Sequence, residues 1–269
     1  MKYLLLIVLL IGCNDGQEEK KPEEPKTPTP VVTPSEPPKE VALDFPKKTI
    51  KSFQIFHFKG LNNFKDKLKD GVELVTLELD QIAEAGKGVA DYAHSKGTKV
   101  ICYVSMGYED WRADAKDYPK DAMGKEMDDW EGERWGDPRK ESLLAFQGKR
   151  MDLCKSLGGD AIELDNIDTY SNQKESGIKI SKEEAVAALN KYADLAHSKG
   201  LAIVAKNAPE IAPNLAKTFD GAYLEQCSRY SECESYKPYI GKPVAMIEYG
   251  WECKKYELAT CQVKAGYFK

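Results

Sequence analysis

The chain has 269 residues, 31% of them charged, and a formal net charge of −5 at pH 7. This length allows one large domain or two small ones, and the negative charge, without any basic run, argues against nucleic acid as the main partner. The sequence has three His, no His/Cys spacing typical of zinc, no phosphate loop and no nucleophile elbow. We therefore expect no metal and no organic cofactor.

The first 13 residues, MKYLLLIVLLIGC, have the layout of an export signal. One Lys precedes an apolar run that is too short to span a bilayer as a mature helix. Residues 10–13, LIGC, resemble the bacterial lipobox, in which the Cys is lipidated. A plain signal peptide with a chance Cys is the alternative. We expect an exported lipoprotein, anchored through Cys13 to the periplasmic or surface face of the cell envelope.

Residues 14–47 are rich in Pro, Glu, Lys and Thr, with little that could fill a core. This composition predicts a disordered, extended tether. The folded domain is then expected at residues 48–269, a size that suits a single α/β barrel, and we expect it to be a monomer.

Apolar runs that predict strands alternate with helical patterns along this domain. Two related stretches, ADYAHSKG (90–97) and ADLAHSKG (193–200), each end a helical pattern at a Gly and precede such a run. Ser181 and Glu184 predict a capping box at the start of the second of these helices. The predicted strands lie at 52–58, 72–78, 98–105, 159–166, 201–207, 219–227 and 243–250, with a possible short one at 265–269.

Apolar strands that alternate with helices indicate a parallel sheet buried on both faces. Seven clear strands and a short or incomplete eighth favour a (β/α)8 TIM barrel; a doubly wound open sheet is the alternative. In such a barrel the functional groups lie at the C-terminal ends of the strands. The acidic residues at or after these ends are Asp80, Glu109, Asp165, Asp168, Glu225 and Glu248. Two carboxylates that flank a bond are what glycoside hydrolysis requires.

Several motifs in order resemble glycoside hydrolase family 114, whose characterised members are endo-α-1,4-polygalactosaminidases. The likeness runs from about Phe53 to Tyr249. The resemblance implies a (β/α)8 barrel, a retaining endo-acting mechanism, and catalytic acids at Asp165 in ELDN and Glu225 in LEQC. The motifs are VICYVSMGYEDWRADA, WEGERWGDPR, GGDAIELDNIDTY, AHSKG, KN, LEQCSRYSEC and GKPVAMIEY.

Other residues near the strand ends are candidates for contacts with the substrate. Asp165 is the expected nucleophile and Glu225 the expected acid/base; an ion-pair network with Lys206 or Arg112 is the structural alternative. Asp168 and Asp80 could instead cap helices, and Glu109 could form a loop ion pair. The predicted substrate contacts are Asp80, Tyr103, Glu109, Arg112, Trp135, Asp168, Lys206, Asn207, Glu248 and Tyr249.

A mouth rich in acids would attract a cationic amino-sugar polymer and repel a uronic acid polymer. The expected function is internal cleavage of an α-1,4-galactosamine-type exopolysaccharide. Two alternatives stay open: a non-catalytic carbohydrate-binding lipoprotein on the same barrel, and a hydrolase of a different amino-sugar glycan.

Seven Cys are present, and lipidation of one would leave six in an oxidising compartment. Cys102 and Cys154 lie in apolar stretches and are interpreted as buried thiols. Short loops could be closed by two pairs, Cys227–Cys233 and Cys253–Cys261.

Overall fold

The computed structural model describes residues 43–250, 252–253, 256 and 259–264. Cys13 and residues 1–42 lie outside the described residues, and so do residues 265–269. In the described part of the chain, no helix is long and apolar enough to cross a membrane.

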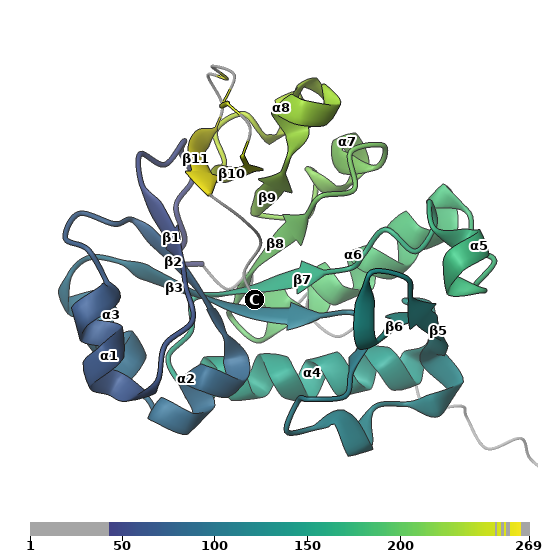
Figure 1. Cartoon of the computed structure of the whole chain (residues 1–269), viewed down its shortest axis with the longest axis horizontal. Helices are drawn as coiled ribbons and strands as arrows, with labels where there is room; N and C mark the ends of the chain where they lie inside the picture. Colours follow the sequence, from purple (N-terminus) through teal and green to yellow (C-terminus); the bar gives the residue numbers. More distant parts are fainter. Residues whose placement is uncertain (1–42, 251, 254–255, 257–258, 265–269) are drawn as a thin grey trace, which may run out of the picture. The chain divides into compact units, whose positions relative to one another are not determined.

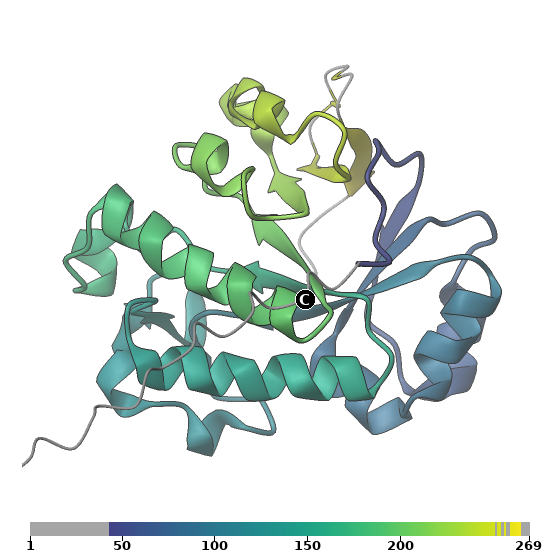
Figure 2. The same cartoon turned by 180° about the vertical axis from the view of Figure 1, so that it is seen from behind.

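Eight parallel strands form a nearly closed barrel (Figures 1 and 2). Their order around the sheet is β1-β2-β3-β7-β8-β9-β10-β11. The (β/α)8 prediction is thus confirmed over the open sheet. The strands are β1 (Phe53–Ile55), β2 (Leu74–Glu78), β3 (Lys99–Ser105), β7 (Ala161–Asp165), β8 (Ala202–Lys206), β9 (Gly221–Glu225), β10 (Val244–Tyr249) and β11 (Thr260–Lys264).

The eighth strand is β11, which begins earlier than the 265–269 segment suggested by the sequence. It pairs in parallel with β10, for example Met246 opposite Cys261. Its side chains also reach the first strand, because the Thr260 hydroxyl donates to the Ile50 carbonyl and the Gln262 amide donates to the Phe53 carbonyl. Figures 1 and 2 both show β11 (yellow) beside β1 (purple).

Helices connect the strands and cover the outside of the barrel. The longest, α4 and α6, pack side by side (Figure 1). The predicted capping box is present, since Ser181 Oγ accepts from the Glu184 amide and Glu184 accepts from the Ser181 amide. The helices are α1 (Gly60–Lys67), α2 (Leu79–Ala85), α3 (Gly88–Ser95), α4 (Glu141–Ser156), α5 (Gln173–Ser176), α6 (Lys182–Ser198), α7 (Ala212–Leu215), α8 (Cys227–Tyr230) and the 3-10 turns η1 (Ala115–Asp117), η2 (Lys120–Ala122) and η3 (Cys233–Tyr239).

The barrel interior has its own apolar cluster, separate from the layer beneath the helices. Inward residues such as Leu74, Ile101 and Ala202 belong to it, and Phe45 and Ile50 pack against them. Phe45 precedes the boundary at Lys48 that the sequence suggested, so the folded domain begins earlier than expected.

A small antiparallel sheet follows β3 and was not predicted. It consists of β4 (Tyr108–Glu109), β5 (Met123–Met127) and β6 (Trp130–Gly136), in the order β4-β6-β5. The approach to β6 is close, because a Cβ on Gly107 would lie 2.4 Å from the Arg134 carbonyl oxygen. Only Gly fits there, and the sheet is thereby held against the end of β3.

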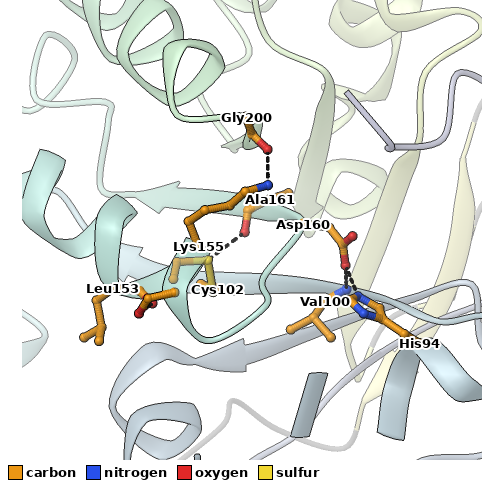
Figure 3. Close-up of a disulfide and its surroundings, with 10 residues drawn as sticks. His94, Val100, Cys102, Leu153, Lys155, Asp160, Ala161 and Gly200 are labelled. Carbon is orange, nitrogen blue, oxygen red and sulfur yellow. Dashed lines mark hydrogen bonds and ion pairs between the residues drawn. A yellow bond between two sulfur atoms is a disulfide. The ribbon is translucent and has the colours of Figure 1, made fainter. Parts of the chain in front are cut away.

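Three disulfides connect the six described Cys. Cys227–Cys233 and Cys253–Cys261 are the two pairs that the short loops favoured. The third joins Cys102 on β3 to Cys154 on α4 (Figure 3), so the interpretation of these two as buried thiols is wrong.

The buried Cys102–Cys154 disulfide also constrains the turn between α4 and β7. A Cβ on Gly159 would lie 2.3 Å from Cys154 Sγ and 2.7 Å from Cys102 Sγ, which leaves no space for a side chain. A strand and a helix that are distant in sequence are thus covalently joined in the core.

The repeated AHSKG stretches make the same contact twice. His94 Nε2 lies 2.7 Å from Asp160 Oδ2, and His197 Nε2 lies 2.8 Å from Asp220 Oδ2. The same Asp160 oxygen accepts from the Val100 amide (Figure 3). Each His–Asp contact connects the end of a helix to the start of a neighbouring strand.

Candidate active site

Three neighbouring strands each end in a charged residue that faces the barrel interior. Asp165 ends β7, Lys206 ends β8 and Glu225 ends β9. The next residue is left-handed in all three cases: Asn166 at φ 57°, Asn207 at φ 50° and Gln226 at φ 57°. Non-glycine residues seldom adopt this conformation, and it concentrates at functional sites. The chain therefore turns sharply away and leaves each charged side chain at the mouth.

One ammonium links the two carboxylates. Lys206 Nζ lies 3.0 Å from Asp165 Oδ2 and 3.2 Å from Glu225 Oε2. These two oxygens are thus no farther apart than the sum of the two distances. Burial disfavours the charge on Lys206, but Asp165, Glu225 and Glu163 outweigh it and raise the pKa of Lys206 well above its ordinary value. Lys206 therefore stays a cation between the two carboxyl groups.

Asp165 is held as an anion. Its Oδ2 also accepts from the Tyr103 hydroxyl at 2.8 Å, and its Oδ1 accepts from the Asn166 amide at 2.8 Å. Burial alone would raise the pKa of Asp165, but the charge of Lys206 and these hydrogen bonds outweigh it and lower the pKa. Burial raises the pKa of Tyr103 well above its ordinary value, so Tyr103 remains a hydrogen-bond donor.

Glu225 has a different environment. Its Oε1 accepts from the Tyr249 hydroxyl at 2.5 Å, and its backbone amide donates to Asn207 Oδ1 at 2.7 Å. Asn207 thus fixes the end of β9 from the end of β8. The structure brings Asp165, Lys206, Asn207, Glu225 and Tyr249 together with Tyr103, as one group at the strand ends.

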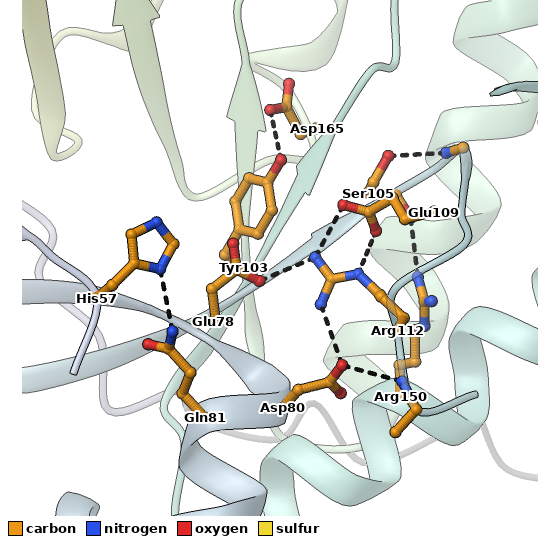
Figure 4. A network of polar contacts seen from close by, with 12 residues as sticks. His57, Glu78, Asp80, Gln81, Tyr103, Ser105, Glu109, Arg112, Arg150 and Asp165 are labelled. Carbon is orange, nitrogen blue, oxygen red and sulfur yellow. Dashed lines mark hydrogen bonds and ion pairs between the residues drawn. The ribbon is translucent and has the colours of Figure 1, made fainter. Parts of the chain in front are cut away.

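A second charge cluster surrounds Arg112 (Figure 4). The guanidinium pairs with both oxygens of Glu109, donates to Glu78 Oε2 at 2.9 Å and lies 4.0 Å from Asp80 Oδ2. Burial outweighs the attraction of Arg112 and raises the pKa of Glu109 to about 7; it also raises the pKa of Glu78. Arg112 lies over the Tyr103 ring at 5.6 Å, which connects this cluster to Asp165.

The charges of these clusters also shift the pKa values of two more acids. Burial, followed by the charge of Asp165, raises the pKa of Asp168 to about 6, and its Oδ2 accepts from Asn172 at 3.0 Å. Burial, followed by the charge of Glu109, raises the pKa of Glu133 to about 7. Neither Asp168 nor Asp80 is the N-cap of a helix, because Glu78 precedes α2 and Asn172 precedes α5.

The two remaining predicted contacts lie apart from these clusters. Glu248 is 0% exposed; its backbone neighbour Ile247 is in register with Glu225, so Glu248 faces away from the barrel interior and accepts from the Ser228 amide at 2.7 Å. Trp135 is 6% exposed, and its Nε1 donates to Glu175 on α5 at 3.0 Å.

Trp111 is the more accessible aromatic residue. It is 53% exposed, and Arg112 lies 4.5 Å from its ring centroid, so one face rests on the guanidinium. The sequence did not single it out over Trp130 or Trp135. Glu78 and Glu133 were missed too, although Glu78 ends a predicted strand and that position was a signal.

The described residues contain no group of three or more His, Cys, Asp or Glu arranged to hold a metal ion. A cavity of about 670 Å³ is lined by β1, Lys67, Lys69 and Gln262, none of which belongs to the two charge clusters.

Comparisons with known proteins identify the family and related folds. Residues 34–267 match the sequence model of glycoside-hydrolase family GH114. The chain is similar to the crystal structure of Aspergillus fumigatus Ega3 in complex with galactosamine, at TM-score 0.73 and 26% identity, over 83% of this chain and 94% of that chain. It is also similar in fold to the glycoside hydrolase domain of PelA from Pseudomonas aeruginosa, at TM-score 0.59 and 18% identity, over 74% of this chain and 83% of that chain. Curated protein sequences gave no match.

Proposed function

This chain belongs to glycoside-hydrolase family GH114, and from that membership we propose that it cleaves α-1,4-linked galactosamine-type exopolysaccharide internally with retention of configuration. The single observation that carries the proposal is the Asp165–Lys206–Glu225 arrangement. One ammonium at 3.0 and 3.2 Å keeps the two carboxylates close. Inverting enzymes need about 6.5 Å or more between them to admit a water, whereas retaining enzymes hold them about 5–5.5 Å apart.

The environments of the two acids support their roles. Asp165, whose pKa is lowered, is the nucleophile that attacks the anomeric carbon. Glu225 donates a proton to the leaving glycosidic oxygen, and a covalent glycosyl–Asp165 ester forms. Glu225 then takes a proton from water, the water oxygen bonds to the anomeric carbon, and the ester bond breaks to restore Asp165.

Lys206 has a supporting role in this sequence. Burial alone would favour protonated Asp165, and the Lys206 ammonium keeps it ionised as the nucleophile. The same ammonium stabilises Asp165 as a leaving carboxylate in the second step. Tyr103 and the Asn166 amide fix the orientation of Asp165. Direct binding of substrate by Lys206 is not needed.

The balance of charge favours a cationic substrate. The acids of the two clusters outnumber their two buried cations, Lys206 and Arg112, so the mouth attracts ammonium groups. The similar Ega3 structure holds galactosamine, which fits an amino-sugar substrate. A hydrolase for another amino-sugar glycan and a non-catalytic binding protein are the alternatives.

The test is product release from de-N-acetylated α-1,4-galactosaminogalactan, followed by mass spectrometry. Wild type should release oligomers of even spacing, and Asp165→Asn and Glu225→Gln should release none while still binding the polymer. Binding without cleavage by wild type would favour the binding-protein alternative. Neither binding nor cleavage would point to another glycan.

We also propose that the protein is exported and anchored by a lipid on Cys13. Three disulfides support an oxidising compartment. Cys13→Ala should move the protein from the membrane fraction to the soluble fraction of the producing cells. Membrane retention of this variant would contradict anchoring at Cys13.

A further inference from the structure

One buried acid at the barrel centre has no role in the mechanism above. Glu163 lies two residues before Asp165 on β7, so its side chain points into the barrel roughly 7 Å beneath the catalytic Asp165. It is 1% exposed. No residue in the described part of the chain hydrogen-bonds its Oε2, and an unpaired buried carboxylate is costly.

The surroundings of Glu163 offer it one cation, which is already shared. Lys206 acts on Glu163 through its charge, but its Nζ contacts Asp165 and Glu225. The Thr76 hydroxyl offers Glu163 a hydrogen bond, but its effect on the pKa is smaller than that of burial or of the neighbouring charges. The groups that face Glu163 are Thr76 from β2, Tyr103 from β3, Asp165 from β7, Lys206 from β8, and Tyr223 and Glu225 from β9.

Two charge states of this group differ in their effect on the site. With Glu163 neutral, Lys206 interacts with Asp165 and Glu225 alone. With Glu163 ionised, a further anion competes for the same ammonium in a region closed to water, and its attraction weakens the contacts of Lys206 with Asp165 and Glu225.

We propose that Glu163 is a positioning residue that works as an uncharged acid: while it keeps its proton, Lys206 stays between the catalytic carboxylates, and when it loses the proton the site is disabled. Glu163 therefore sets the alkaline limit of the enzyme. Burial first, then the charges of Asp165 and Glu225, raise the pKa of Glu163 to about 8, against the opposing charge of Lys206, which places this limit just above neutral pH.

The first test uses stability alone and is independent of the substrate. Glu163→Gln preserves the shape of the side chain and cannot ionise. Because folding raises the pKa of Glu163, the wild type loses stability relative to this variant as pH rises from about 4.5 to about 8. Below and above this range, the difference in unfolding free energy between the two proteins is constant. Denaturant unfolding of the full chain at pH 4 to 9 measures it. Thr98→Val is the control that should show no such trend, because the buried Thr98 hydroxyl donates to the Val72 carbonyl. A pH-independent difference for Glu163→Gln would overturn the proposal.

The second test measures turnover and rests on the proposed function. At pH 6 the Glu163→Gln variant should keep wild-type kcat within a few fold. By pH 9, about one pH unit above the pKa, roughly a tenth of wild-type Glu163 remains protonated, so the variant should be about ten-fold more active relative to wild type than at pH 6. Titration of the polymer's own amines affects both proteins equally and cancels in the ratio.

The outcomes separate the two ideas. A constant activity ratio, or an inactive but folded Glu163→Gln, would overturn the role of Glu163. A wild type that cleaves no polymer at any pH would contradict the proposed function, while the stability test still decides the ionisation of Glu163. If the Gln variant does not fold, Glu163→Leu gives the same comparison with another uncharged side chain.

Discussion

Two buried cations stand at the mouth of the barrel, and they are used differently. Arg112 spreads its donors over Glu109 and Glu78 in fixed directions (Figure 4). Lys206 presents one compact ammonium to Asp165 and Glu225, which come from the strands on either side. A planar guanidinium locks its partners, whereas an ammonium can redistribute its attraction between two acids.

This difference separates a structural cluster from a chemical one. The Arg112 cluster holds the loop after β3 against the end of β2, and the Lys206 cluster contains the two acids that change charge in turn in the proposed mechanism. Under that proposal, the same residue types near the same strand ends serve stability in one place and catalysis in the other.

The largest effect is expected for Lys206→Met. Loss of the ammonium removes the main charge that keeps buried Asp165 ionised, so the pKa of Asp165 rises and the nucleophile is protonated. We expect kcat/KM to fall by about 10³-fold or more, a loss similar to removal of a preorganised transition-state donor.

Lys242→Met is the matched control for Lys206→Met. Lys242 is half-buried and donates to the Ala216 and Phe219 carbonyls, away from the charged strand ends. Its replacement should affect stability and leave kcat unchanged. Equal losses of kcat in both variants would contradict a specific role for Lys206.

Arg112→Met should act mainly on stability. It leaves Glu109 and Glu78 buried without their cation, and such uncompensated charges typically cost about 3–5 kcal/mol. Denaturant unfolding measures the loss, with Arg139→Met as the control. Arg139 pairs with Asp137 and Glu184 at a more exposed site, where we expect about 1 kcal/mol or less. A smaller loss for Arg112 than for Arg139 would reverse the assignment.

The two clusters should also respond to pH in opposite directions. The pKa of Glu109 is raised from 4.5 to about 7, so its contribution to stability is present in acid and lost as pH rises through about 7. The pKa of Asp165 is lowered, so its contribution is present above about pH 4 and lost as pH falls below that.

Unfolding measured from pH 3 to 8 gives this comparison directly. Relative to Glu109→Gln, wild type should lose up to about 3 kcal/mol between pH 4.5 and 7, at 1.36 kcal/mol per pH unit. Relative to Asp165→Asn, wild type should gain stability as pH rises through the acidic end of the range. Parallel trends in the two comparisons would show that the clusters are not distinct.

Much of this site could be predicted because parallel strands end at one edge. Asp165, Lys206 and Glu225 each follow an apolar run, and the barrel brings their side chains together. Sequence alone did not separate the inward from the outward face, because both faces of these strands are buried. Glu248 shows the consequence: it lies on the outer face, and only its register with Glu225 through Ile247 reveals this.

The sequence also did not predict which distant segments contact each other. Cys102 and Cys154 are 52 residues apart in sequence, and nothing in the sequence around either indicates the partner. The pairing of Arg112 with Glu78 is of the same kind. The β4-β6-β5 sheet escaped notice because its segments are rich in Gly and charged residues, and tertiary contacts override such weak strand propensity.

The smallest effect is expected for Trp111→Ala, which examines where the two clusters meet the substrate. The Arg112 guanidinium contacts both this ring and the ring of Tyr103, whose hydroxyl donates to Asp165. A sugar ring bound beyond the catalytic pair can stack on Trp111, and loss of about 1 kcal/mol corresponds to a KM about five-fold higher. Because stacking needs a chain long enough to reach Trp111, the effect should appear with the polymer and disappear with the shortest cleavable oligomer. Trp130 is also exposed, and Trp130→Ala should leave the KM unchanged for both the polymer and the oligomer. An equal rise in KM for long and short substrates would mean that Trp111 acts on Arg112, and through it on the site, and that it does not bind a distant sugar.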